Sequence, residues 1–357
     1  MKLPSRAACV LVVIGMSQAA SAQHVDPLDI RACTAIGSDS QRLACYDRAT
    51  HRDDTTAQRE ADEQIRNAGV FTQPGKATAD AAPSALHRSL LDSRWELDPS
   101  SKLGTFNLRS FRPVYVMPFF ATSKQNNQPH SPNPNNSASE REHIDNIEAK
   151  FQLSLKTKVW QGVFGDEGDV WVGYTQSSRW QVYNSKESRP FRESDYEPEA
   201  MLVFDTHYRA LGWDGRLLGI GIDHQSNGRS DPYSRSWNRI VANIGFERDG
   251  WTVMLRPWWR IPESRSEDNN PDINDYVGRG EMQVLHVWNS QEFGLALRHS
   301  LRGGDASHGS ARFSWSYPLA GNLRGYFELF HGHGESLIDY NHEATYVGVG
   351  VSLLDWY

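Results

Sequence analysis

Apolar and polar residues alternate along most of the chain from residue 112 to its end. Between Ala311 and Tyr317, apolar side chains at odd positions alternate with polar ones at even positions. A period of two places successive side chains on opposite faces of a β-strand. The polar positions of comparable segments often hold arginine, as at Arg256 and Arg298. We therefore expect strands with one apolar and one charged face.

The charged face distinguishes between two all-β architectures. A soluble sandwich buries the apolar faces of two sheets against each other, whereas a transmembrane barrel turns its apolar face to lipid and keeps polar side chains in the lumen. Repeated inward arginines favour the barrel. About twelve segments alternate in this way, and an even number suits a closed antiparallel bacterial barrel. They are expected to begin near Arg112, Asn146, Gly168, Glu199, Arg216, Ser236, Trp251, Asp275, Glu292, Ser310, Leu323 and Thr345.

The connections between these segments alternate in length. External loops of outer-membrane barrels are long and periplasmic turns short, so both chain ends are expected on the periplasmic side. The last strand ends in Tyr357, an aromatic end that resembles the carboxy-terminal signature of such barrels. Long connections are expected at residues 123–143, 185–198, 227–235, 262–274 and 334–343, a moderately long one at 303–309, and short turns at 249–250 and 320–322.

The first 104 residues do not follow the strand pattern. Lys2 and Arg6 precede an apolar stretch of about ten residues, and small residues at 20–22 follow it, which predicts a signal peptide at 1–22. An anchoring helix is the weaker alternative because the apolar stretch is too short. Residues 23–104 are polar and helix-prone, which predicts a small periplasmic appendage and linker before the barrel at 105–357.

Two cysteines, Cys33 and Cys45, remain after the predicted cleavage. Disulfides persist in exported proteins, so we expect these cysteines to pair and to stabilise the appendage by about 3 kcal/mol. A zinc site is disfavoured because no histidine cluster accompanies them. A cysteine nucleophile is disfavoured because it would have to stay reduced outside the cytosol.

Composition excludes other classes of protein. Charged residues make up 23% of the chain, and no run of about 18 apolar residues follows residue 22, so a bundle of transmembrane helices is excluded. The net charge of −7 gives no basic excess, and no nucleic-acid motif is present, so we expect no nucleic-acid partner.

Three polar residues fall on the apolar, outward face near one rim of the predicted barrel. His224 and Ser226 share a face with Ile222, and on the next strand Asn238 shares a face with Ile240. Polar side chains that face hydrocarbon cost free energy unless they bond to one another, and they usually have a function. The alternative is a set of interfacial polar residues at the depth of the lipid headgroups.

These residue types can form a catalytic triad. A serine becomes nucleophilic when a base takes its proton, and a histidine two residues away on the same face can do this. An amide such as that of Asn238 can hold the histidine in the required tautomer. Because an amide stabilises imidazolium less than a carboxylate does, we expect additional positive charge at the developing oxyanion, for example from a bound cation.

From about residue 105 to Tyr357 the chain resembles bacterial outer-membrane phospholipase A, a family of twelve-stranded, calcium-dependent lipases. The resemblance implies Ser226 as nucleophile, His224 as general base and Asn238 as orienting residue. It also implies that the Gly228 N–H, with calcium-bound water, stabilises the oxyanion. The resembling stretches are 174–181, 188–193, 196–199, 224–239 and 332–341.

The resemblance also implies Ca²⁺ as cofactor and an active homodimer. The expected calcium ligands are the carbonyl of Arg229, the hydroxyl of Ser234 and, from the other subunit, Ser188. Gln176 matches a polar residue of the family's dimer interface. Oxygen ligands of this kind suit Ca²⁺.

The leading hypothesis is an outer-membrane hydrolase that cleaves sn-1 and sn-2 acyl esters of phospholipids and lysophospholipids, with its active site toward the outer leaflet. The main alternative is a non-enzymatic pore or adhesin. A pore is disfavoured because about twelve strands lined by large side chains leave little open lumen. A secreted soluble esterase is a further alternative.

Overall fold

The computed structural model describes residues 33–34, 36–49 and 89–354. The predicted signal peptide at 1–22 and the terminal Tyr357 lie outside the described residues. The chain divides into two compact units, residues 1–67 and 68–357.

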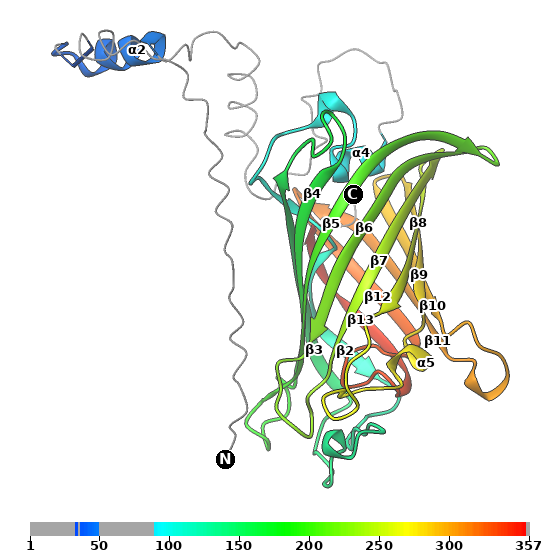
Figure 1. Ribbon diagram of the computed structural model, residues 1–357. Helices are drawn as coiled ribbons and strands as arrows, with labels where there is room; N and C mark the ends of the chain where they lie inside the picture. The colour runs from blue at the N-terminus through cyan, green and yellow to red at the C-terminus, as the bar shows by residue number, and fades with distance from the viewer. Residues whose placement is uncertain (1–32, 35, 50–88, 355–357) are drawn as a thin grey trace, which may run out of the picture. The chain divides into compact units, whose positions relative to one another are not determined.

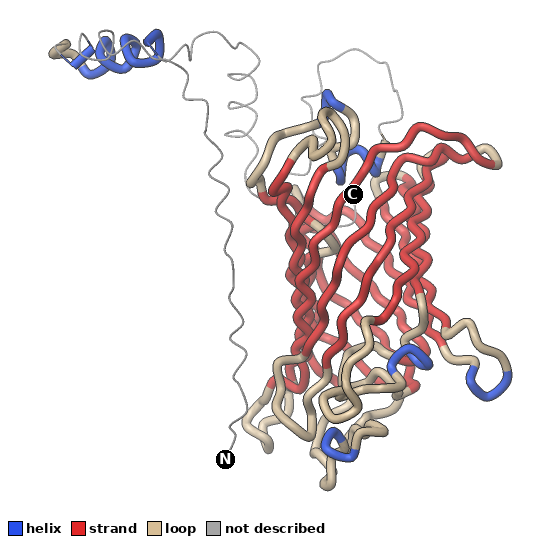
Figure 2. The backbone as a smooth tube through the Cα atoms, viewed as in Figure 1, coloured by secondary structure: helices blue, strands red, loops and turns tan. Residues whose placement is uncertain are grey.

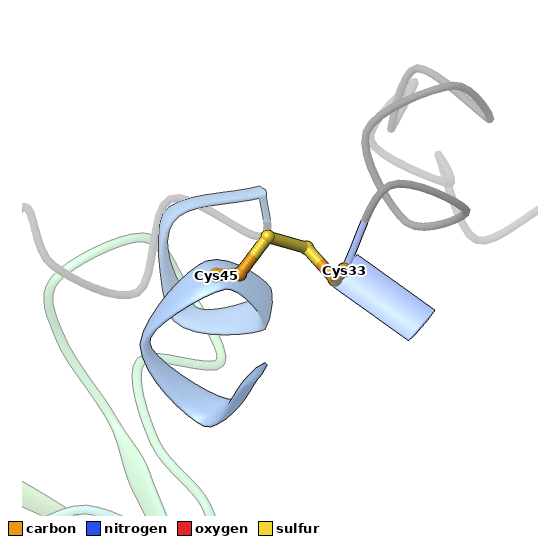
Figure 3. The surroundings of a disulfide bond; sticks show 2 residues. All are labelled: Cys33 and Cys45. Carbon is orange, nitrogen blue, oxygen red and sulfur yellow. A yellow bond between two sulfur atoms is a disulfide. The ribbon is translucent and has the colours of Figure 1, made fainter. Parts of the chain in front are cut away.

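The first unit contains helix α2 (Asp39–Ala49). Cys45 of this helix is joined by a disulfide to Cys33, which precedes it (Figure 3). Asp39 in the first turn forms an ion pair with Arg42, one turn along the helix. The bridge links the helix covalently to the segment before it, and it is the pairing expected for the two cysteines of an exported protein.

The second unit is a β-barrel (Figures 1 and 2). From β2 to β13 each strand pairs antiparallel with the next, and β13 pairs with β2, so twelve strands close the barrel. This confirms the predicted architecture. The short β1 (Leu108–Ser110) pairs with β3 beyond the start of β2. The barrel strands are β2 (Val114–Thr122), β3 (Ile147–Trp160), β4 (Asp169–Trp180), β5 (Phe191–Ala210), β6 (Trp213–Ser226), β7 (Ser236–Arg248), β8 (Trp251–Arg260), β9 (Gly280–Trp288), β10 (Gln291–His299), β11 (Gly309–Ala320), β12 (Leu323–His333) and β13 (Glu343–Leu354).

The remaining described elements are short. They are helices α4 (Leu90–Trp95) and α5 (Ile273–Tyr276) and 3-10 turns η2 (Pro99–Ser101), η3 (Pro134–Asn136) and η4 (Gly304–Ala306). No helix in the described ranges has the length and apolarity needed to cross a bilayer.

The two faces of the strands differ as the alternation predicts. On β6 the even-numbered Ile220 and Ile222 are 55% and 62% exposed, whereas Asp223 is buried on the other face. On β3 the inward Lys150 is buried and forms an ion pair with Glu328 of β12 (2.7 Å). Apolar side chains therefore cover the outside, and paired charges fill the inside.

Two strand boundaries predicted from the sequence are wrong. β5 begins at Phe191 rather than near Glu199, because its charged residues point inward and pair: Arg192 binds Glu148 (3.0 Å). The predicted long loop at 185–198 is therefore shorter. β9 begins at Gly280 rather than near Asp275, because residues 273–276 form helix α5.

The connections give the barrel two different ends. At one end, which we call the long-loop end, lie the connections 123–146, 181–190, 227–235, 261–279, 300–308 and 334–342. At the opposite, short-turn end, the connections 211–212, 249–250, 289–290 and 321–322 have two residues each.

Helix α4 packs against inward-facing side chains of the barrel strands. Leu91 and Trp95 are buried in a cluster with Trp171 and Leu217, which belong to β4 and β6. The Lys156 ammonium lies 3.0 Å from the centroid of the Trp95 ring. The predicted appendage, residues 23–104, thus includes a segment whose side chains pack inside the barrel.

Candidate active site

His224 and Ser226 occupy the last outward positions of β6, at the long-loop end. Leu218, Ile220 and Ile222 precede them on the same face and are exposed. His224 and Ser226 are only partly buried. The alternation of side chains therefore continues to the end of the strand and places both groups on the outer, apolar surface.

Asn238 lies beside His224 because the register of β6 and β7 pairs these two residues. The Asn238 Oδ1 and His224 Nδ1 atoms are 2.8 Å apart. If Nδ1 carries the proton, it donates a hydrogen bond to the amide oxygen and leaves Nε2 as a free base. This is the tautomer that a general base for Ser226 requires.

Within the described residues, no hydrogen bond joins the Ser226 hydroxyl to the His224 ring. The two side chains are two residues apart on one strand face, and contacts between nucleophile and base often tighten only when substrate binds. The structure thus brings His224 and Asn238 together and leaves Ser226 on the same face beside them.

Glu263 is a further member of this group. Its Oε1 accepts a hydrogen bond from Asn238 Nδ2 (3.0 Å). The sequence pattern predicts a loop at residue 263 and indicates no role for it. The outward parity of Trp259 and Ile261, continued by two residues, could have identified it.

The loop after β6 is organised by the buried Asn227. Its Oδ1 accepts the N–H of Arg235 (3.0 Å), and its Nδ2 donates to the Tyr233 carbonyl (2.8 Å). These two bonds of Asn227 hold the loop in one conformation next to Ser226. On the same loop, burial raises the pKa of Tyr233, and the carboxylate of Glu142 raises it further.

Gly228 follows Asn227 with a φ of +62°, a conformation that favours glycine. A Cβ atom at this position would lie 3.2 Å from the Tyr196 ring. In the described part of the chain the N–H of Gly228 has no acceptor. This N–H is therefore free to donate to a ligand beside Ser226.

The predicted calcium ligands Arg229 and Ser234 lie on this same loop. Within the described ranges the Arg229 carbonyl accepts no hydrogen bond. The Ser234 hydroxyl accepts one from Asn269 Nδ2 (2.8 Å), and a second lone pair remains. An unpaired carbonyl and a hydroxyl are hard oxygen donors, so their chemistry fits Ca²⁺.

Ser188 and Gln176 lie apart from this loop. Ser188 is exposed on the connection between β4 and β5. Gln176 lies on the outer face of β4, where its Oε1 accepts a hydrogen bond from the hydroxyl of Tyr174 (3.2 Å). In the β-sheet register Gln176 is opposite Tyr196, which is in turn opposite Ser226. A polar patch thus extends across the apolar surface from Ser226 to Gln176.

Comparison with known proteins places this geometry in context. The family model for phospholipase A1 matches residues 91–353. A protein of Neisseria meningitidis serogroup B is 34% identical over 351 residues, which cover 90% of each chain. The phospholipase A1 of Escherichia coli (strain K12) is 42% identical over 208 residues, 58% of this chain and 70% of the relative.

A solved structure gives the same fold. The outer membrane phospholipase of Salmonella typhi, a dimer with bound calcium, is 37% identical to this chain and superposes with a TM-score of 0.63. The match covers 71% of this chain and 94% of the other.

Proposed function

The chain belongs to the phospholipase A1 family, and we propose that it hydrolyses sn-1 and sn-2 acyl esters of phospholipids and lysophospholipids. The observation that carries this proposal is the 2.8 Å contact between His224 and Asn238 on the apolar outer surface, beside Ser226. A lipid ester in the membrane reaches this surface without leaving the bilayer.

In the proposed reaction the Ser226 hydroxyl attacks the ester carbonyl while His224 Nε2 takes its proton. The C–O bond to the glycerol breaks, the leaving oxygen receives that proton, and the acyl group remains on Ser226. Water then attacks the acyl-enzyme and gives its proton to His224. The fatty acid leaves, and the Ser226 hydroxyl is restored. Asn238 holds the ring of His224 through Nδ1 in both steps.

The negative charge that develops on the carbonyl oxygen needs donors. The free N–H of Gly228 is the proposed donor from this chain. The Arg229 carbonyl, the Ser234 hydroxyl and the partner subunit's Ser188 would hold Ca²⁺. When bound, the cation supplies positive charge near the oxyanion and offsets the weak charge stabilisation by an amide in the triad.

We further propose that the active form is a homodimer with Gln176 in its interface. The dimeric, calcium-bound relative supports this assignment. The polar Gln176 on an otherwise apolar surface supports it as well, because polar side chains on a lipid-facing surface usually have a function. The long-loop end would face the outer leaflet, and the N-terminal unit would lie in the periplasm after removal of residues 1–22.

The experiment compares refolded wild type with Ser226→Ala on phospholipid in detergent micelles, each with calcium and with chelator. We expect fatty-acid release only from calcium-loaded wild type, and a loss of at least about 10³-fold without the nucleophile. Heat-dependent gel mobility verifies that both barrels are folded. Equal, negligible release from all four folded samples would favour the pore or adhesin hypothesis.

A further inference from the structure

Glu263 lies where β8 leaves the barrel wall next to Asn238. The odd-numbered side chains of β8 point outward, and Trp259 is 73% exposed. The N–H of Ile261 donates to the backbone carbonyl of Asn238 (2.8 Å), so pairing with β7 continues one residue past the strand. Two residues later the side chain of Glu263 is on the same outward face as Asn238.

The Asn238 amide is bound at both of its ends. Its oxygen lies 2.8 Å from His224 Nδ1, and its nitrogen donates to Glu263 Oε1 at 3.0 Å. If the amide flipped, it would present its oxygen to the carboxylate and its N–H to the ring, and both bonds would be lost. The carboxylate therefore fixes which end of the amide faces His224.

Within the described residues, no cation neutralises the charge of Glu263. In the part of the chain that the structure describes, Glu263 forms no ion pair. Neighbouring charges pair among themselves: inward Asp223 with Arg239 (3.0 Å), and Arg260 with Asp268 (2.6 Å). Glu263 is therefore the carboxylate that acts on the outer side of Asn238.

We propose that Glu263 is a positioning residue for the general base His224, acting through the Asn238 amide. It locks the amide orientation, and its negative charge, one amide away from the ring, stabilises the imidazolium that forms when Ser226 loses its proton. This inference rests on the proposed function and adds a fourth member to the Ser-His-Asn group.

The test separates the hydrogen bond from the charge. Glu263→Ala removes both, whereas Glu263→Gln keeps a carbonyl acceptor and removes the charge. We expect kcat to fall about tenfold in the first and about threefold in the second, with KM within about twofold of wild type. The acidic limb of the kcat/KM profile should move to lower pH in both, because a less stabilised imidazolium loses its proton more readily. Glu267→Gln is the matched control: Glu267 is an exposed carboxylate of the same loop whose side chain, within the described residues, is bonded only to Ser264 (3.0 Å).

A second measurement does not depend on hydrolysis. NMR titration of ¹⁵N-histidine-labelled protein follows His224, whose signal is assigned by its loss in His224→Gln. The midpoint for His224 should be lower in Glu263→Gln than in wild type and unchanged in Glu267→Gln. An unchanged His224 midpoint with unchanged kcat in both Glu263 variants would overturn the proposal, as would an equal shift in the Glu267 control. If wild type does not hydrolyse phospholipid, the proposed function fails, and the titration still decides the role of Glu263.

Discussion

Asn238 on β7 connects two groups from the neighbouring strands: His224 on β6 and Glu263 just after β8. Each contact depends on a single side-chain atom. We therefore expect a change at this residue to alter the tautomer and orientation of the histidine without altering the barrel.

Replacement of Asn238 by alanine should lower kcat on micellar phospholipid by about 10- to 100-fold, equivalent to about 1.4 to 2.8 kcal/mol of transition-state stabilisation. Steady-state kinetics at several substrate concentrations measure this loss. Ile240→Ala, a lipid-facing neighbour on β7, is the control and should keep its kcat. An Asn238→Ala enzyme as fast as wild type would mean that the amide does not orient His224.

Helix α4 is the element that ties the segment before the barrel to the strands. Ser89 caps it and bonds to Glu247 of β7, and the N–H of Leu91 also donates to Glu247 (2.6 Å). A Cβ atom at Gly245 would lie 2.7 Å from Leu91, so this glycine leaves the space that the leucine fills. The packing is therefore specific to one register of helix and strand.

The variant Leu91→Ala should destabilise the barrel by about 2 to 5 kcal/mol, because it leaves a cavity where a fully buried side chain was. Guanidinium unfolding in micelles, followed by tryptophan fluorescence, measures the change. Leu90→Ala on the same helix removes a less buried leucine and should cost clearly less. Similar values for both would show that the Leu91 contact does not hold the helix.

The barrel as a whole has a filled lumen. Arg112 binds Glu197 (2.7 Å), and Arg256 binds Glu199 (2.7 Å). Trp95 and Phe111 pack edge to face nearby, with ring centroids 5.9 Å apart. A cavity of about 160 Å³ remains among these side chains. Such a space holds a few water molecules, and the paired charges and rings around it disfavour a continuous path for ions.

We therefore expect wild-type protein in planar bilayers to give no stable single-channel steps, in contrast to an open porin tested in parallel. Regular conductance steps from pure, folded protein would contradict the filled lumen and favour the pore hypothesis.

The amino-acid sequence determined the elements and their faces. Alternation with a period of two predicted twelve strands with apolar outer faces, and it also placed His224, Ser226 and Asn238 outward, because side-chain direction in a strand depends only on parity. The start of β5 was predicted too late, since inward charges such as Arg192 have the same pattern as a polar loop. Their partners on other strands are not visible in the local sequence. The start of β9 was predicted too early, because the residues before it form helix α5.

Contacts between distant segments were decided only by the tertiary structure. The register of β6 and β7 sets Asn238 opposite His224, and the end of β8 brings Glu263 to the far side of the same amide. The packing of α4 against β6 and β7 likewise joins residues more than 100 positions apart, such as Leu91 and Glu247. Parity gives the direction of a side chain, but pairing between strands, fixed by barrel closure, gives its neighbours.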